Sequence, residues 1–179
     1  MYSTIKNYLL IAFLGGLSIL AMVFFVVALI YPTLPNISHL EKYYPKQPLQ
    51  IYSKDEVLIA EFGEERRDFI AISETPQQMI NAILSIEDRR FFEHPGIDII
   101  GITRAALKNI SGKSHEGAST ITMQVARNFF LTSEKTLKRK INEILLAIKI
   151  ERTLSKEEIL ELYVNQIYLG QRSFGFVAA

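Results

Sequence analysis

The chain begins with one long apolar stretch and then changes to the mixed pattern of a folded domain. Positions 8 to 31, 24 residues, carry no charged side chain. As a helix this stretch is about 36 Å long, at about 1.5 Å per residue, against roughly 30 Å for the hydrocarbon layer of a bilayer. A cleaved signal peptide is the alternative, although its apolar region is normally only about 7–15 residues long. We therefore predict a membrane-spanning helix over residues 8–31, preceded by a short tail, residues 1–7.

The next two segments read as a connection and a small β element. Residues 32–50 contain four prolines and no helical or strand period, which predicts a stalk. Two short apolar runs, Ile51-Tyr52-Ser53 and Val57 to Phe62, then flank the polar centre Lys54-Asp55-Glu56. This arrangement predicts a β-hairpin within residues 51–72.

From residue 73 onward the apolar positions repeat with a helical period, and polar start signals precede each predicted helix. Pro76 follows Thr75, and Gln78 stands three residues after that threonine, as at a capped helix start. Asp98 predicts a helix through Ile110 that ends at Gly112. Ser119 predicts the cap of a helix that runs to about Phe129, and a further helix is predicted over 133–152, beginning near Ser133. A capping box at Ser155 begins the last predicted helix, which ends at Gly170.

These five helices predict a mainly α domain over residues 51–179, with its helical catalytic part over 73–179. The polar stretch from Ser111 to Gly117 contains two glycines and is predicted to be a mobile loop. Because the sequence finishes on the apolar run Phe174 to Ala179 soon after a helix, we expect helices beyond residue 179 to complete the core.

Composition excludes several kinds of chemistry. A net charge of +1, with charges scattered along the chain, argues against nucleic acid as a partner. The absence of cysteine removes disulfides, thiolate nucleophiles and Cys-ligated metals. One local excess of four positive charges lies between positions 127 and 149, where six cations, Arg127, Lys135, Lys138, Arg139, Lys140 and Lys149, stand against Glu134 and Glu143.

Two glutamates are the candidate catalytic residues. Glu87 falls one turn after Ile83, on the apolar side of its predicted helix, where a carboxylate is costly to keep charged and becomes a better base. The alternative is that Glu87 marks the helix end and turns to water. Close by, Phe91 and Phe92 can wall a cleft, and His94 before Pro-Gly is expected to have a structural role near the site.

The second glutamate, Glu143, shares a helix with cations. With about 100° per residue, Arg139, Glu143, Leu146, Ala147 and Ile150 fall opposite the stripe of Leu137, Ile141, Ile144, Leu145 and Ile148, so both faces are expected to be covered. Arg139 and Lys140, four and three residues before Glu143, would keep it ionised. An ordinary intrahelical salt bridge is the alternative explanation of this spacing.

Between these glutamates lies a segment rich in hydroxyl groups. Ser119, Thr120 and Thr122 surround a predicted helix start, and Gln124 and Arg127 follow on successive turns. Helix-start N–H groups, hydroxyls and a cation together suit a phosphate group.

Four motifs occur in order between residues 87 and 170, and their combination is specific. They read Glu-Asp-Arg-x-Phe-x-x-His-x-Gly, Gly-Ala-Ser-Thr-x-Thr-x-Gln-x-x-Arg-Asn, Arg-Lys-x-x-Glu and Ile-Leu-Glu-Leu-Tyr-Val-Asn-Gln-Ile-Tyr-Leu-Gly. Together with the apolar N-terminal helix and the hairpin, they resemble the peptidoglycan glycosyltransferase (transglycosylase) domain of class A penicillin-binding proteins.

The resemblance implies a lysozyme-like α-helical fold and a reaction that joins lipid II units, with undecaprenyl pyrophosphate as the leaving group. It implies that Glu87 is the acid/base, drawn as the base for the acceptor hydroxyl, and that Glu143 assists on the donor side. Three cations, Arg127, Arg139 and Lys140, match positions that neutralise the pyrophosphate. Five further residues match positions that shape the cleft: Asp88, Phe91, His94, Thr120 and Gln124.

The resemblance also implies the surroundings of the enzyme. Its partners would be lipid II, the growing glycan strand and the membrane, and other cell-wall synthesis proteins stay open. The chain would be a single-pass protein of the bacterial inner membrane, with residues 1–7 in the cytoplasm and the catalytic domain in the periplasm, although its charges alone do not fix this orientation. No cofactor is implied, and a divalent cation, Mg²⁺ or Mn²⁺, near Glu143 and a pyrophosphate is left open.

Two other functions stay open on the residues alone. Paired carboxylates on an α-rich domain also serve a lysozyme-like cell-wall hydrolase, and a non-catalytic, membrane-anchored fragment is the third reading. The sole Ser-x-x-Lys, at Ser3, lies beside the membrane segment without the companion motifs of a transpeptidase, so no transpeptidase site is expected in these 179 residues.

Overall fold

The computed structural model describes residues 2–45, 48–63, 66–110 and 117–179. They divide into two compact units at Pro35 and Asn36. The first unit is helix α1 (Tyr2–Ile30) with a 3₁₀ turn, η1 (Tyr31–Thr33), and Pro32 lies in that turn. In the described part of the chain, this is the one helix long and apolar enough to cross a membrane, over Ile5–Thr33. The predicted apolar helix is therefore confirmed.

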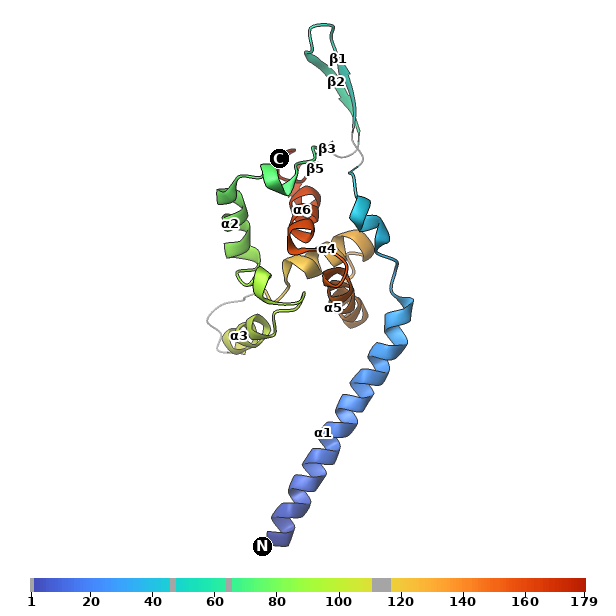
Figure 1. Ribbon diagram of the computed structural model, residues 1–179, viewed down its shortest axis with the longest axis vertical. Helices are drawn as coiled ribbons and strands as arrows, with labels where there is room; N and C mark the ends of the chain where they lie inside the picture. Colours follow the sequence, from blue (N-terminus) through green and yellow to red (C-terminus); the bar gives the residue numbers. More distant parts are fainter. Residues whose placement is uncertain (1, 46–47, 64–65, 111–116) are drawn as a thin grey trace. The chain divides into compact units, whose positions relative to one another are not determined.

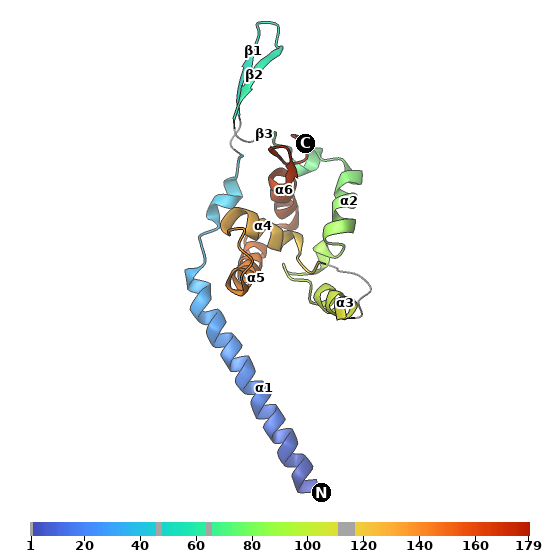
Figure 2. The ribbon, with the colours of Figure 1, turned by 180° about the vertical axis from the view of Figure 1, so that it is seen from behind.

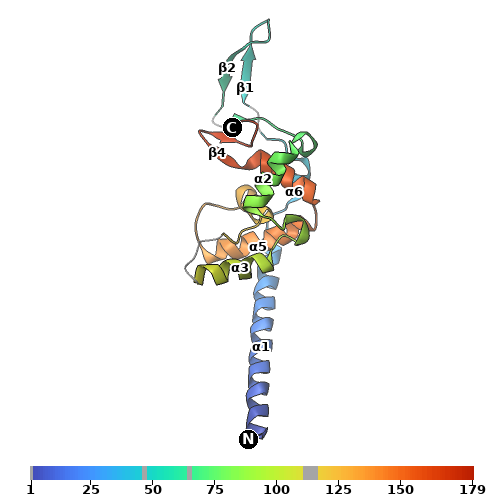
Figure 3. The same ribbon diagram turned by 90° about the vertical axis from the view of Figure 1, so that its left-hand side faces the viewer.

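The second unit opens with a short 3₁₀ helix, η2 (Ser38–Lys42), and the predicted hairpin. Strands β1 (Leu49–Tyr52) and β2 (Leu58–Phe62) pair antiparallel, with Leu49 opposite Phe62. Figure 3 shows these two strands side by side. At the turn, the Ser53 N–H donates to the Val57 carbonyl at 2.8 Å. The hairpin is thus confirmed, beginning two residues before the predicted strand.

Five α-helices follow, as predicted, and they form two groups. They are α2 (Gln77–Glu87), α3 (Ile99–Ile110), α4 (Ile121–Phe130), α5 (Leu137–Glu151) and α6 (Lys156–Gln166). Helix α4 packs against both α5 and α6. Figures 1 and 2 show α2 and α3 on one side of this α4–α6 group. Two short 3₁₀ helices, η3 (Ile72–Glu74) and η4 (Phe91–Glu93), precede and follow α2.

The helix starts agree with the sequence at two positions and differ at three. Asp98 accepts from the Gly101 N–H at 2.9 Å, and Ser155 forms its capping box with Glu158. At α2, however, the Thr75 hydroxyl donates to the Ala71 carbonyl, and the helix begins after Pro76 without a side-chain cap. Thr120, not Ser119, caps α4, and α5, which was predicted to begin near Ser133, begins after its cap Thr136. The predicted helix end at Gly112 and most of the predicted 111–117 loop lie outside the described residues.

The last helix is shorter than predicted, because the chain folds back along it. Helix α6 ends at Gln166, and residues 168–174 form β4 (Tyr168–Gly170) and β5 (Ser173–Phe174) in place of the helix expected up to Gly170. Gly170 has a φ of +98°, which favours glycine and turns the chain between these strands. Strand β5 also pairs in parallel with β3 (Arg66–Arg67). This pairing joins two segments far apart in the sequence.

The core lies between α4, α5 and α6. The face of α5 that enters it is the one with Glu143, opposite the stripe of Leu137. Four residues of this face are fully buried, with 0% of their surface exposed: Glu143, Leu146, Ala147 and Ile150. Leu137, on the opposite stripe, is 86% exposed. Burial of apolar area contributes about 25 cal/mol per Å², so the small and large apolar side chains of this face stabilise the α4–α5 contact. The expectation that both faces are covered holds for the Glu143 face and fails at the start of the other stripe, where Leu137 and Ile141 are exposed.

Candidate active site

Glu87 is the last residue of α2 and its side chain is exposed. Its Oε2 accepts a hydrogen bond from Gln124 Nε2 on α4 at 2.8 Å. The expectation of a desolvated Glu87 on the apolar face is wrong, because the helix stops there and the chain turns away at Asp88, which has φ −160° and ψ 77°. Glu87 is therefore a solvent-facing carboxylate held on one oxygen by an amide.

Asp88, the neighbour of Glu87, is buried and ties this turn to the start of α4. Its two oxygens lie 2.9 and 3.0 Å from His94 Nε2, and Oδ2 accepts from the Ile121 N–H at 3.0 Å. An ionised carboxylate only accepts, so His94 Nε2 carries the proton. The helix start of α4 favours the negative charge of Asp88. Asp88 and His94 thus fix the backbone next to Glu87 from below the surface.

The loop that carries these residues is clamped against α5 and α6. Lys156 Nζ donates to the His94 carbonyl and to Glu151, both at 2.7 Å, and lies 4.4 Å from the centre of the Phe91 ring. Gly96 has a φ of +90°, and a Cβ there would lie 3.0 Å from the Ala147 carbonyl oxygen. Phe91 is 0% exposed, so it supports the loop from within the core, while Phe92 is exposed.

Thr120 completes this support. Its hydroxyl donates to the Gly96 carbonyl at 2.7 Å and accepts from the Met123 N–H at 3.2 Å. One side chain therefore caps α4 and holds the loop of Asp88 and His94. The position of Glu87 depends on both the start of α4, which carries Gln124, and this loop.

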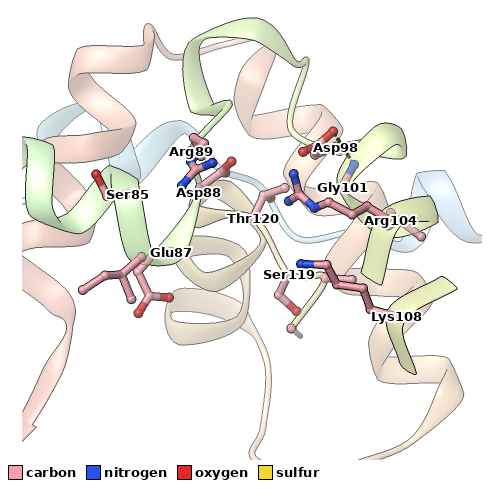
Figure 4. A pocket seen from close by; sticks show the side chains of 14 residues that line it. Ser85, Glu87, Asp88, Arg89, Asp98, Gly101, Arg104, Lys108, Ser119 and Thr120 are labelled. Carbon is pink, nitrogen blue, oxygen red and sulfur yellow. Dashed lines mark hydrogen bonds between the residues drawn. The ribbon is translucent and has the colours of Figure 1, made fainter. Parts of the chain in front are cut away.

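A cavity of about 360 Å³ opens beside Glu87, between the end of α2, the helix α3 and the start of α4. Glu87, Ser119 and Thr120 line it together with three cations, Arg89, Arg104 and Lys108. Figure 4 shows Arg104 and Lys108 extending from α3 toward the segment of Ser119 and Thr120. The cavity is polar and suits an anionic ligand that brings a hydroxyl group to Glu87.

Glu143 has the opposite environment to Glu87, since its side chain is 0% exposed. Arg139 Nη1 donates to Oε2 at 2.6 Å and Lys140 Nζ donates to Oε1 at 2.7 Å. The Arg139 side chain is 17% exposed and that of Lys140 is 37% exposed. A buried carboxylate needs such pairing. The predicted cation cluster at Glu143 is thus present, and the carboxylate lies on a covered helix face, as expected, and not on the exposed face of an ordinary surface salt bridge.

Ser119 joins the two halves of the site. Its hydroxyl accepts from Lys140 Nζ at 2.9 Å, and the same residue lines the cavity beside Glu87. Lys140 therefore stands between the buried Glu143 and the segment that borders the cavity. This contact spans 21 positions in the sequence.

Arg127 lies one turn after Gln124 on α4 and is half-buried. Unlike Arg139 and Lys140, it belongs with Glu87, because the charges of Arg127 and Glu87 act on the same buried phenol, that of Tyr163. The structure thus separates the three predicted pyrophosphate cations into two places.

The sequence left open a divalent cation near Glu143 and a pyrophosphate. Both Glu143 oxygens already accept from cationic groups. Among the described residues, no three His, Cys, Asp or Glu side chains gather in a way that could hold a metal ion. The negative charge of Glu143 is therefore balanced by the protein's own cations.

Sequence reasoning missed several residues of the site. Arg104 and Lys108 are spaced by four on α3, so they share one face, and this spacing was the available signal. Ser119 was predicted as a helix cap and as one of the hydroxyls suited to a phosphate group, but its contact with Lys140 was not predicted, and Lys156 and Tyr163 carried no signal beyond their helix. Their roles come from contacts between distant segments.

Comparison with known proteins shows the family of the chain. A family model described as Transglycosylase matches residues 55–179. Penicillin-binding protein 1A of Neisseria gonorrhoeae is 53% identical over 159 residues, which cover 88% of this chain and 20% of the relative. Penicillin-binding protein 1A of Vibrio cholerae serotype O1 is 49% identical over 167 residues, 93% of this chain and 20% of the relative.

The chain thus spans about a fifth of the length of these curated relatives. The match of the family model begins in the hairpin and includes α2 to α6, that is, each residue of the cavity and of the Glu143 cluster. The expected likeness to the transglycosylase domain of class A penicillin-binding proteins is confirmed, and the chain belongs to the transglycosylase family.

Proposed function

We propose that this chain is a peptidoglycan glycosyltransferase that polymerises lipid II into glycan strands. One observation carries the proposal: the exposed Glu87 borders a cavity lined by cations, and Ser119 connects that cavity to Lys140 beside Glu143. A base and an anion-binding group at the two ends of one site suit transfer of a sugar from an anionic leaving group. Membership of the transglycosylase family supports the same reaction class.

Glu87 acts as the general base. Gln124 holds Oε2, so Oε1 is available for the 4-hydroxyl of an acceptor sugar in the cavity. That hydroxyl gives its proton to Glu87 while its oxygen attacks the anomeric carbon of the donor. The bond between this carbon and the pyrophosphate oxygen breaks, and undecaprenyl pyrophosphate leaves with the electron pair. The accuracy with which Glu87 is placed, and not its desolvation, makes it effective.

Glu143 acts through its cations. Buried between Arg139 and Lys140, it does not reach a sugar, but it fixes the Lys140 ammonium next to the Ser119 hydroxyl. These two groups supply charge-assisted and neutral hydrogen bonds to the departing pyrophosphate. Arg127 supplies a further cation near Glu87. The Glu143 oxygens are themselves paired with these protein cations.

Helix α1 keeps the catalytic unit at the bilayer that carries the lipid-linked substrate. We place α1 in the bacterial inner membrane as a single span, with the catalytic unit in the periplasm. In spheroplasts, a protease added outside should digest the catalytic unit. Protection of that unit until the membrane is dissolved would reverse the orientation.

Glu87→Gln tests the catalytic assignment. In the detergent-solubilised full-length protein, glycan polymer formed from lipid II is measured by gel electrophoresis. Loss of the base should lower the rate by at least about a hundredfold. Because Glu87 is exposed, Tm should stay at the wild-type value. Glu157→Gln, an exposed glutamate in the first turn of α6, is the matched control and should keep the wild-type rate.

The same preparation separates the two alternative functions. Release of soluble fragments from finished cell wall, without polymer from lipid II, would establish a hydrolase instead. Binding of lipid II without product, at the wild-type sequence, would establish a non-catalytic module. A full polymerisation rate in Glu87→Gln would exclude Glu87 as the base.

A further inference from the structure

Tyr163 on α6 has a buried hydroxyl group that the fold leaves without a partner. The side chain is 1% exposed, and its oxygen forms no hydrogen bond with any described residue. Elsewhere the domain satisfies such a group: the hydroxyl of Tyr43 donates to Gln166 Oε1 at 2.8 Å. A buried polar atom without a partner destabilises a folded protein and calls for an explanation.

Tyr163 lies close enough to Glu87 and Arg127 for both charges to act on its hydroxyl group. Its helix packs on α4, the helix that carries Gln124 and Arg127. Burial raises the pKa of Tyr163 above its ordinary value, the nearby Glu87 carboxylate raises it further, and the Arg127 guanidinium opposes this rise. The phenol is therefore neutral at physiological pH, with one O–H to donate and lone pairs to accept.

The two charged neighbours can move, whereas the phenol is fixed. Glu87 is exposed and is held on one oxygen by Gln124. Arg127 forms no ion pair or side-chain hydrogen bond to another described residue. Tyr163, by contrast, is enclosed in the α4–α6 contact. A neutral hydroxyl between a carboxylate and a guanidinium can donate to the first and accept from the second.

We propose that Tyr163 is a positioning residue of this active site, whose hydroxyl donates to Glu87 and accepts from Arg127 when substrate is bound. The proposal rests on the proposed function, since it assigns to Tyr163 the alignment of the base with a cation on the pyrophosphate. A fixed dipole costs no reorganisation during the reaction. The unpaired oxygen of the resting enzyme is the group that substrate binding brings into use.

Tyr163→Phe removes this oxygen and leaves the apolar packing in place. In the detergent-solubilised full-length protein with lipid II, kcat should fall by about tenfold to a hundredfold while KM stays within about twofold. Tm should stay constant or rise, because no hydrogen bond to a described residue is lost. Tyr43→Phe is the matched control: it loses a hydrogen bond, so Tm should fall while kcat is unchanged.

A double-mutant cycle separates positioning from a general effect on the fold. If the hydroxyl acts through Arg127, Tyr163→Phe should change kcat little in an Arg127→Gln background. Additive losses in the two variants, or a fall in kcat of Tyr163→Phe that follows a fall in Tm, would overturn the proposal.

The outcome also separates this inference from the proposed function. Wild-type kcat in Tyr163→Phe, together with a dead Glu87→Gln variant, would refute the role of Tyr163 alone. Absence of polymer from the wild-type protein would refute both.

Discussion

Glu87 and Glu143 are the same residue type in opposite surroundings. Glu87 stands at a helix end, open to solvent, with a neutral amide on one oxygen, whereas Glu143 is 0% exposed between two cations. An exposed carboxylate can be removed with little effect on the fold, and a buried one cannot. In the proposed reaction the two tasks are therefore separate: Glu87, which would take the proton, is accessible to the acceptor hydroxyl, and Glu143, which would hold the cations in place, is part of the core.

Glu143→Gln should give the largest change in stability. It leaves Arg139 and Lys140 without a compensating charge, and breaking a buried pair costs about 3–5 kcal/mol. Because the Lys140 side chain is 37% exposed and can turn to water, the lower end of that range is expected. Chemical denaturation measures the free energy of unfolding, with Glu87→Gln as the comparison. Equal stabilities of the two variants would remove the distinction between the residues.

Lys140→Met should weaken the binding of lipid II more than it lowers the stability of the fold. Arg139 still pairs with Glu143 at 2.6 Å in this variant, so most of the stability is retained. Loss of a charge-assisted hydrogen bond, about 1.5–3 kcal/mol, should raise KM for lipid II by about tenfold or more. Steady-state kinetics against Lys138→Met, an exposed neighbour on the same helix, provide the measurement and its control. A change confined to Tm would assign Lys140 to the core and not to the donor side.

The sequence predicted the helices better than it predicted the environments of the two glutamates. Helical period placed Glu87 one turn after Ile83, but it could not show that α2 ends at Glu87, so that no further turn covers it. The same period found both faces of α5, yet which one is buried depends on where α4 packs.

Contacts between distant segments were the least predictable part. The bond from Lys140 to Ser119 depends on how α5 lies beside the start of α4, and the burial of Tyr163 depends on the contact of α6 with α4. Local rules also competed at single positions. Ser119 and Thr120 are both good capping residues. Thr120 caps α4, and its hydroxyl also donates to the Gly96 carbonyl, whereas the Ser119 hydroxyl accepts from Lys140.

Glu158→Gln should give the smallest change in stability. Glu158 represents a third environment, that of an exposed carboxylate with a purely structural role. The Ser155 N–H and then the Ser155 hydroxyl hydrogen-bond to Glu158 and lower its pKa from 4.5. Its contribution to stability is therefore present above that value and is lost as the pH falls through the lower folded pKa. Since the group is solvent-screened, Glu158→Gln should cost only a few tenths of a kcal/mol at pH 7. Unfolding measured at pH 7 and at pH 3 should show this difference shrinking in acid. A loss as large as that of Glu143→Gln would mean that partners, and not burial, set the cost of removing a carboxylate in this domain.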